Sequence, residues 1–183
     1  MLYILSKDEP WNATYCTPEG QAMYKATSPA KLTGRKAYID KIIPNGVVAH
    51  DMEDRFTRLA QIDFHTFTSS KITMGGITRH TDDIFRKKRV GWFGRDRIFQ
   101  GPDGNEYRWE LGSWKPELYL NDNTKTLVAK YHQKHTDVFQ DARPASLEIF
   151  PPGENIPDMI IVTFVYIEYL RLAREETAEA VGG

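Results

Sequence analysis

One stretch of sequence decides the fold: Pro157-Asp158-Met159-Ile160-Ile161-Val162-Thr163-Phe164-Val165-Tyr166-Ile167-Glu168-Tyr169-Leu170-Arg171. Between Met159 and Ile167 the only polar groups are the side chain of Thr163 and the hydroxyl of Tyr166. A helix of this composition has no polar face, and such a helix is either fully buried or in a membrane. A membrane span needs about 20 mostly apolar residues, and charged residues begin at Glu168. The stretch therefore predicts a helix buried inside the protein.

A strand is the alternative for the same stretch, because β-branched residues such as Ile160 and Val162 favour strands. Three features favour the helix. Asp158 follows Pro157 and predicts an N-cap, which would accept a hydrogen bond from a free N–H of the first turn. The segment continues without a turn residue to Glu176 in good helix-forming sequence. Its length also exceeds that of an ordinary strand.

Length and composition indicate one soluble intracellular domain. The chain has 183 residues and a net charge of −1, so no overall field attracts it to nucleic acid or to a membrane. The lone Cys16 excludes an intramolecular disulfide and fits a reducing compartment, so we expect a cytoplasmic protein. The apolar run Met1–Leu5 is too short for a signal peptide. We expect a single domain over residues 1–177 and a flexible tail over 178–183.

Turn signals recur along the chain and separate short strand-like runs. The clearest predicted hairpin joins Arg97–Gln100 to Glu106–Glu110 through the turn Gly101–Asn105. The spacing of the turns predicts about ten to twelve strands, with the charged segment Ala49–Leu59 as a polar loop. We therefore predict a mainly β fold: a closed antiparallel barrel of about twelve strands around the buried C-terminal helix.

Several motifs of this chain resemble a known superfamily. These are the hairpin motif Asp103-Gly104-x-x-Tyr107-x-Trp109 and the hydrophobic C-terminal helix. Together they resemble the tubby C-terminal-like superfamily, which includes tubby domains, phospholipid scramblases and LURP-one-related proteins. The resemblance implies a twelve-stranded barrel around a central helix, and phosphoinositide or phospholipid contact in some members. The resemblance implies lipid contact through the shared fold alone and assigns it to no residue of this chain.

A narrower resemblance covers most of the chain and is best from about Phe85 to Arg174. It rests on the following motifs: Arg97-x-Phe99, Gly101-Pro102-Asp103-Gly104-x-x-Tyr107-x-Trp109, Ala145-Ser146-Leu147-Glu148-Ile149 and Thr163-Phe164-Val165-Tyr166-Ile167-Glu168-x-Leu170-Arg171. With these motifs the chain is similar to an uncharacterised family of proteins from mushroom-forming fungi. That family implies no activity, so the resemblance bears on the fold and leaves the function open.

The candidate site is a basic stretch that also contains aromatic residues. We predict lipid contact by these side chains: Arg86, Lys87, Lys88, Arg89, Trp92, Arg95 and Arg97. Cations attract anionic headgroups by about 1 kcal/mol each near a surface, and Trp prefers the membrane interface. The structural alternative is a solvated sheet edge, where cations block strand pairing.

Other reactive residue types give weaker signals. His132-x-x-His135 with Asp137 resembles a metal motif, but residues three apart on a strand face opposite sides, so we predict no metal. Cys16 has no recognisable base, and His50, His65 and His80 show no ligand spacing. Glu168 is a candidate pocket acid, or alternatively a local ion-pair partner of Arg171 or Arg174. We expect Thr163 and Tyr166 to bond to barrel backbone.

Two classes of function stay open. The first is a non-catalytic binding module that contacts anionic phospholipid through the basic stretch. The second is an enzyme or small-ligand carrier with a pocket at a barrel mouth. No phosphate loop, nucleophile elbow or carboxylate pair is present, and no motif points to a cofactor. The sequence does not define an oligomeric state.

Overall fold

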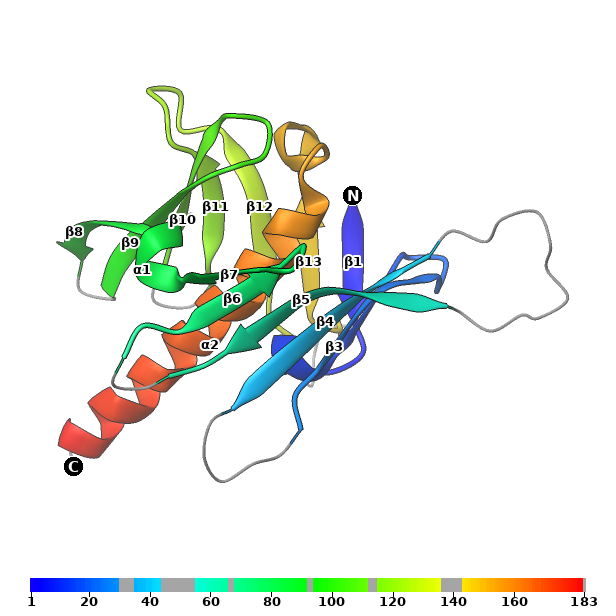
Figure 1. Cartoon of the computed structure of the whole chain (residues 1–183), viewed down its shortest axis with the longest axis horizontal. Helices are drawn as coiled ribbons and strands as arrows, with labels where there is room; N and C mark the ends of the chain where they lie inside the picture. Colours follow the sequence, from blue (N-terminus) through cyan, green and yellow to red (C-terminus); the bar gives the residue numbers. More distant parts are fainter. Residues whose placement is uncertain are drawn as a thin grey trace, which may run out of the picture. The chain divides into compact units, whose positions relative to one another are not determined.

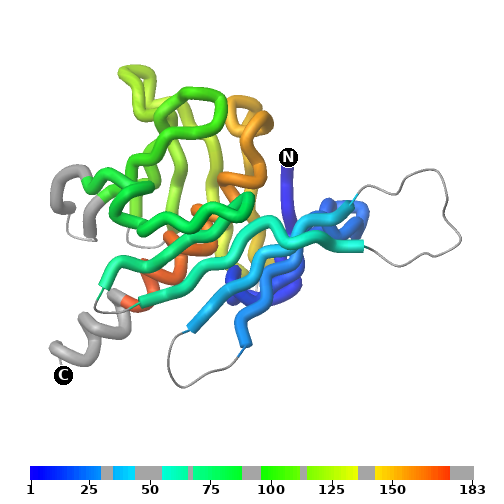
Figure 2. The backbone as a smooth tube through the Cα atoms, viewed as in Figure 1, coloured from blue at the N-terminus to red at the C-terminus, as the bar shows by residue number. Residues whose placement is uncertain are grey.

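The structure is a computed structural model of the chain, and it describes residues 1–29, 35–43, 55–65, 68–91, 94–111, 115–135 and 143–182. For residues 88–91, 94, 95 and 174–182 it describes the backbone alone. Figure 2 draws the remaining residues in grey, together with those of which only the backbone is described.

Strands make up most of the described chain (Figure 1). The strands are β1 (Leu2–Leu5), β2 (Thr14–Cys16), β3 (Ala22–Thr27), β4 (Lys36–Ile42), β5 (Phe56–Asp63), β6 (Lys71–Met74), β7 (Ile77–His80), β8 (Arg86–Gly91), β9 (Gly94–Gln100), β10 (Glu106–Glu110), β11 (Glu117–Leu120), β12 (Leu127–His132) and β13 (Ser146–Ile149). The helices are α1 (Thr81–Ile84), α2 (Pro157–Gly182) and the 3-10 turns η1 (Pro10–Asn12) and η2 (Pro151–Gly153).

The strands form one antiparallel sheet in the order β7-β6-β5-β4-β3-β2-β1-β13-β12-β11-β10-β9-β8. The prediction of a mainly β fold with one long C-terminal helix is confirmed. The sheet has 13 described strands, more than were predicted. Hydrogen bonds among the described strands do not close it, with β7 and β8 at its ends, so the closed barrel stays a prediction.

The chain divides into two compact units. The first contains Met1, Asp82–Gln133 and Leu147–Gly183, and the second contains Leu2–Thr81 and Lys134–Ser146. Each unit combines segments that are far apart in sequence, because the chain leaves the second unit near Thr81 and returns to it near Lys134. The backbone of α2 is helical through Gly182, and the expected domain boundary at 177 stays a prediction.

In the first unit, helix α2 is the apolar element that the sequence predicted (Figure 1). Its residues from Ile160 to Glu168 are all buried. Phe164 packs against Tyr131 of β12 with ring centroids 4.9 Å apart, and against Trp109 of β10 at 6.1 Å. Tyr166 stacks on Phe85 at 5.3 Å. The helix is buried on all sides because its sequence offers no polar side to solvent.

The start of α2 differs by two residues from the prediction. The helix begins at Pro157, a residue whose fixed φ suits the first helical position. Asp158 therefore lies inside the first turn and is not the N-cap. Its carboxylate there still interacts favourably with the positive end of the helix dipole.

The predicted hairpin of the first unit is confirmed. Strand β9 pairs with β10 in the register Gln100↔Glu106, Phe99↔Tyr107, Ile98↔Arg108 and Arg97↔Trp109. Gly104 in the connecting turn has φ +84°, a conformation that costs other residues free energy. The alternation of Tyr107 and Trp109 with Arg108 and Glu110 corresponds to buried and half-buried sides of β10.

The second unit contains β1 to β7, and β2 to β7 each pair with the preceding strand. Its core includes Tyr3 and Tyr24, which meet edge to face at 5.6 Å. Within the expected polar loop Ala49–Leu59, the residues from Phe56 onward belong to β5. That part of the loop prediction is wrong because cross-strand pairing with β4 decides the structure there. Residues 49–54 lie outside the described residues.

Candidate functional site

The basic stretch forms the hairpin of β8 and β9 in the first unit. The register runs from Arg86↔Ile98 to Gly91↔Gly94, with an irregularity between Lys88 and Val90. Strand β8 is the last strand in the sheet order. The four cations Arg86–Arg89 therefore lie on an end strand, as the structural alternative also required.

Two of the predicted lipid-contacting side chains are described and exposed. Arg86 Nη2 lies 2.6 Å from Glu106 Oε1, and Lys87 Nζ lies 2.6 Å from Asp82 Oδ1. All four partners of these pairs are solvent-exposed, and exposed pairs of this kind contribute about 0–1 kcal/mol. Because these pairs are weak, Arg86 and Lys87 can exchange their carboxylate partners for other anions at little cost in free energy.

The other members of the basic stretch fall into two groups. Lys88, Arg89 and Arg95 lie on described strand backbone, but their side chains are not described. Trp92 lies outside the described residues. For these four positions, lipid contact stays a prediction from sequence.

Arg97 differs from the exposed cations, because only 4% of it is exposed. It lies opposite Trp109 in the ladder of β9 and β10. Cross-strand partners share one face of a sheet, and Trp109 Nε1 donates to Thr163 Oγ1 of α2 at 3.0 Å. Arg97 is thus on the covered face of β9, which does not fit its predicted place in a surface patch.

Glu168, the candidate pocket acid, forms a buried ion pair. Its two carboxylate oxygens accept hydrogen bonds from Arg171 Nε at 2.9 Å and from Arg171 Nη2 at 2.8 Å. Glu168 is 2% exposed and Arg171 is 5% exposed. Both oxygens are occupied by one guanidinium in a two-point contact. The local-pair alternative with Arg171 is confirmed, and it gives Glu168 a structural role.

Thr163 anchors the helix to β10 by side-chain contacts. Its Oγ1 donates within its own helix, toward the carbonyls of Met159 at 2.8 Å and Ile160 at 3.2 Å, and accepts from Trp109 Nε1. A bond to strand backbone was expected. The hydroxyl instead satisfies the indole N–H, which is a donor that needs a partner when Trp is buried.

The turn motif Gly101-x-Asp103-Gly104-x-x-Tyr107 is held by one carboxylate. Asp103 Oδ2 accepts from the Tyr107 hydroxyl at 2.7 Å and from Asn105 Nδ2 at 2.8 Å. A Cβ on Gly101 would lie 2.6 Å from Asp103 Oδ1 and 2.7 Å from the Tyr107 ring. The spacing of this motif is therefore explained by the turn, without any ligand.

The same contacts change the acidity of both groups. Burial would raise the pKa of Asp103, but the hydrogen bonds from Tyr107 and Asn105 lower it below its ordinary value. Burial, followed by the hydrogen bond to Asp103, raises the pKa of Tyr107 to about 12. Both shifts favour the state in which the tyrosine donates to a charged carboxylate.

This pair predicts a loss of stability at alkaline pH. The pKa of Tyr107 in the folded protein, about 12, exceeds the ordinary value of 10.0. The protonated hydroxyl therefore stabilises the fold fully below pH 10, and this contribution disappears as the pH rises toward 12. The free energy of unfolding, measured by denaturant titration, should fall between pH 10 and pH 12 by on the order of 2 kcal/mol more in the wild-type protein than in Tyr107→Phe. Equal losses in the two proteins would contradict the assignment.

Among the described residues, the histidines and Cys16 form no cluster of metal ligands. His132 Nε2 lies 3.1 Å from Glu148 Oε2, and His135 forms an isolated bridge with Arg143. His65 and His80 are exposed, and Cys16 is half-buried on β2. In the ranges that the structure describes, no three His, Cys, Asp or Glu side chains gather as metal ligands. Asp137 and His50 lie outside those ranges.

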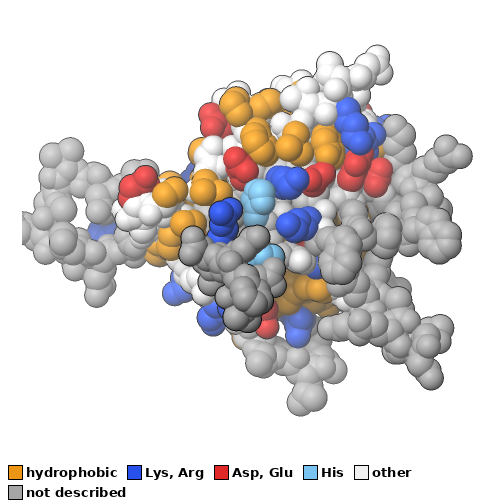
Figure 3. Space-filling model, turned by 180° about the vertical axis from the view of Figure 1, so that it is seen from behind, with side chains coloured by type: hydrophobic (Ala, Val, Ile, Leu, Met, Phe, Trp, Pro, Cys, Tyr) orange, Lys and Arg blue, Asp and Glu red, His pale blue; other side chains and the backbone are white. Residues whose placement is uncertain are grey.

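A polar network on the first unit was not predicted from the sequence. Arg108 Nη2 donates to Glu110 Oε1 at 2.7 Å, and Lys130 Nζ lies 2.7 Å from Glu117 Oε1. The Tyr119 hydroxyl also donates to Glu117. The hydrogen bond from Lys130, followed by that from Tyr119, lowers the pKa of the Glu117 carboxyl. The only sequence signal is that these residues alternate with buried ones. The surface in Figure 3 likewise mixes charges of both signs with apolar side chains.

No helix in the described part of the chain is both long and apolar enough to cross a bilayer. No curated protein and no solved structure matches this chain. One family model does match it, over residues 8–173, and its description is a family of unknown function, DUF6593. Because this match covers most of the sequence, the chain belongs to the DUF6593 family of unknown function.

Proposed function

We propose that this chain is an intracellular, non-catalytic binding module that contacts anionic phospholipid surfaces through its basic stretch. The observation that carries the proposal is the run of four cations, Arg86–Arg89, on the end strand β8. Arg86 and Lys87 are exposed, and their exposed acidic partners are exchangeable for headgroup phosphates. Arg97 is not part of the proposed contact.

We also propose that the fold is a tubby C-terminal-like barrel closed around α2. Support comes from the antiparallel sheet, from the buried helix that follows it, and from the Asp103–Trp109 motif in the β9–β10 hairpin. A closed barrel has no free strand edge, so in such a barrel β8 would be paired on both sides. Its cations would then face an approaching membrane together with Trp92.

The lipid proposal predicts salt-sensitive binding to acidic vesicles. Wild-type protein should sediment with phosphatidylcholine vesicles that contain phosphatidylserine, and much less with phosphatidylcholine alone. Exposed charges are screened within about 8 Å at physiological salt, so binding should weaken as salt is raised. Tryptophan emission should shift to the blue on binding, and this shift should be absent in Trp92→Phe.

The matched variants separate a local site from overall charge. Changing Arg86, Lys87, Lys88 and Arg89 to Ser should reduce vesicle partitioning at least about a hundredfold, because each cation contributes about 1 kcal/mol. The control changes four other exposed cations to Ser: Lys7, Lys25, Arg55 and Lys115. This control has the same net charge and should bind like wild type. Equal loss in both variants, or no binding at low salt, would overturn the lipid contact.

A further inference from the structure

The hairpin of β8 and β9, in the first unit, extends past the ladder that joins it to β10. The ladder between β9 and β10 ends at the pair Arg97↔Trp109. The ladder between β8 and β9 continues beyond this row to the pair Gly91↔Gly94. We call this two-stranded extension the prong, residues 88–91 and 94–96. The two residues that join its strands lie outside the described residues and are not part of it.

The irregularity of β8 lies within the prong. The register shifts between Lys88 and Val90, so that Arg89 is the extra residue of the strand. Extra residues of this kind are frequent at the rims of barrels. In the proposed closed barrel, the prong would therefore project from one rim, while the rest of β8 would stay paired within the wall.

Positive charge is concentrated toward the end of the prong. Lys88 lies directly opposite Asp96, and Asp96 Oδ2 also lies 4.0 Å from Arg108 Nε. Beyond this row, the strands contain Arg89 and Arg95 and no acidic residue. The end of the prong therefore carries two cations for which its own strands provide no carboxylate.

Arg86 and Lys87 lie at the other end of β8. Each lies 2.6 Å from a carboxylate oxygen, Arg86 from that of Glu106 and Lys87 from that of Asp82. A strand rises about 3.3 Å per residue, so along β8 Arg86 lies about 17 Å and Lys87 about 13 Å from Gly91. Both distances exceed the screening length of about 8 Å at physiological salt. A membrane at the end of the prong would feel little of their charge.

The positions of Arg86 and Lys87 also bear on the direction of approach. Arg86 pairs with Ile98 and Lys87 pairs with Arg97. Successive residues of a strand face opposite sides of the sheet. A flat surface laid against one face of β8 could reach only one of these two cations. A surface that meets the hairpin at its end is reached by both of its strands.

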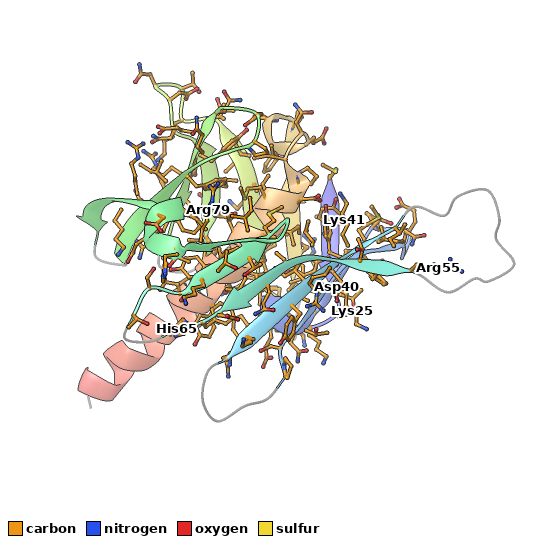
Figure 4. All side chains as sticks on the ribbon, viewed as in Figure 1. Lys25, Asp40, Lys41, Arg55, His65 and Arg79 are labelled. Carbon is orange, nitrogen blue, oxygen red and sulfur yellow. The ribbon has the colours of Figure 1, made fainter. Side chains whose placement is uncertain are left out.

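Several cations on the strands of the second unit lie beside carboxylates. Lys25 lies opposite Asp40 in the ladder of β3 and β4 (Figure 4). Arg58 Nε lies 2.5 Å from Asp40 Oδ1, and Lys36 Nζ lies 3.3 Å from Asp63 Oδ1. Because a nearby acid offsets their charge, these cations are less suited to attract an anionic surface than the end of the prong.

We propose that the prong meets the membrane end-on, and that Arg89 and Arg95 make the main contacts with anionic headgroups. This inference rests on the proposed lipid contact and assigns it to one end of the basic stretch. Strand β8 would then stand steeply on the bilayer surface. Arg86 and Lys87 would contribute less than Arg89 and Arg95, because they lie farther from the headgroups.

Two double variants with the same change in charge test the assignment. Arg89→Ser with Arg95→Ser removes the two cations at the end of the prong, and Arg86→Ser with Lys87→Ser removes the two at the other end of β8. The first should weaken partitioning to phosphatidylcholine vesicles that contain phosphatidylserine by about thirtyfold. The second should weaken it by less than about threefold, because those charges are screened. Far-UV circular dichroism should be the same for both variants and wild type.

A probe of depth tests the orientation without a change of these charges. A nitrobenzoxadiazole label is attached to Val90→Cys, near the end of the prong, or to Gln100→Cys, at the other end of β9, with Cys16→Ser in both proteins. Val90 lies opposite Arg95, so the two labels are about 17 Å apart along β9. Nitroxide-labelled phosphatidylcholine in the vesicles should quench the label at position 90 strongly and the label at position 100 little.

The results separate this inference from the lipid proposal itself. A large loss of binding in the Arg89 and Arg95 variant, a small loss in the Arg86 and Lys87 variant, and selective quenching at position 90 support end-on contact. Equal losses in the two variants, a larger loss in the Arg86 and Lys87 variant, or equal quenching at both positions would overturn it and leave the lipid contact in place. A wild-type protein that does not bind acidic vesicles at low salt would overturn both.

Discussion

Replacing Ile161 with Asp should abolish cooperative folding. Ile161 is 0% exposed and lies between Ile160 and Val162, which are also buried. A carboxylate at this position would either be ionised without a cationic partner or be protonated at a cost in free energy. Either state costs several kcal/mol in addition to the lost apolar contacts. Domains of this size are stable by about 5–15 kcal/mol in total, so little or no stability should remain.

The measurement is near-UV circular dichroism with a thermal melt. The Ile161→Asp protein should lack aromatic near-UV signal and a cooperative transition. The matched control is Ile77→Asp, the same change at a side chain that is 60% exposed on β7. That variant should melt within a few degrees of wild type, since exposed substitutions usually change stability by less than about 0.5 kcal/mol. A soluble, cooperatively melting Ile161→Asp protein would contradict burial of α2.

The elements that could be predicted are those whose sequence signal is local. The stretch from Met159 to Ile167 is apolar at every position, and burial is the only soluble environment that suits it. The hairpin Arg97–Glu110 combines period-two alternation with a Gly-rich turn, and both are short-range signals. The strand at Phe56–Leu59 was missed because the charged residues just before it, from Asp51 to Arg55, resemble a loop, while pairing with β4 is a long-range effect.

The candidate site was harder to predict than the fold. Arg86 and Lys87 were expected at the surface and are exposed, but Arg97 in the same stretch is buried. The difference depends on which face of β9 is covered by α2, and composition does not carry that information. The buried pair of Glu168 and Arg171 was one of two alternatives, since spacing of three residues permits the contact without showing what surrounds it.

Removing the arginine of that pair should strongly destabilise the protein. Arg171→Met would leave the Glu168 carboxylate, 2% exposed, without the guanidinium that now contacts both of its oxygens. Breaking a buried pair on one side typically costs about 3–5 kcal/mol. The same chemical change at the surface, Arg86→Met, removes the exposed ion-pair partner of Glu106 and should cost about 1 kcal/mol or less. Urea unfolding of both variants measures the two costs.

The double variant Glu168→Leu with Arg171→Met distinguishes pairing from packing. If the cost in Arg171→Met comes from an unpaired buried charge, removing the charge as well should restore most of the stability, because apolar residues of similar volume often replace a buried pair at no loss. The coupling energy between the two positions should then exceed about 2 kcal/mol. If Arg171 acts mainly through the packing of its aliphatic stem, the two costs should add, and the double variant should be the least stable of the set. A fully stable double variant would also show that Glu168 is needed for the fold only as the partner of Arg171.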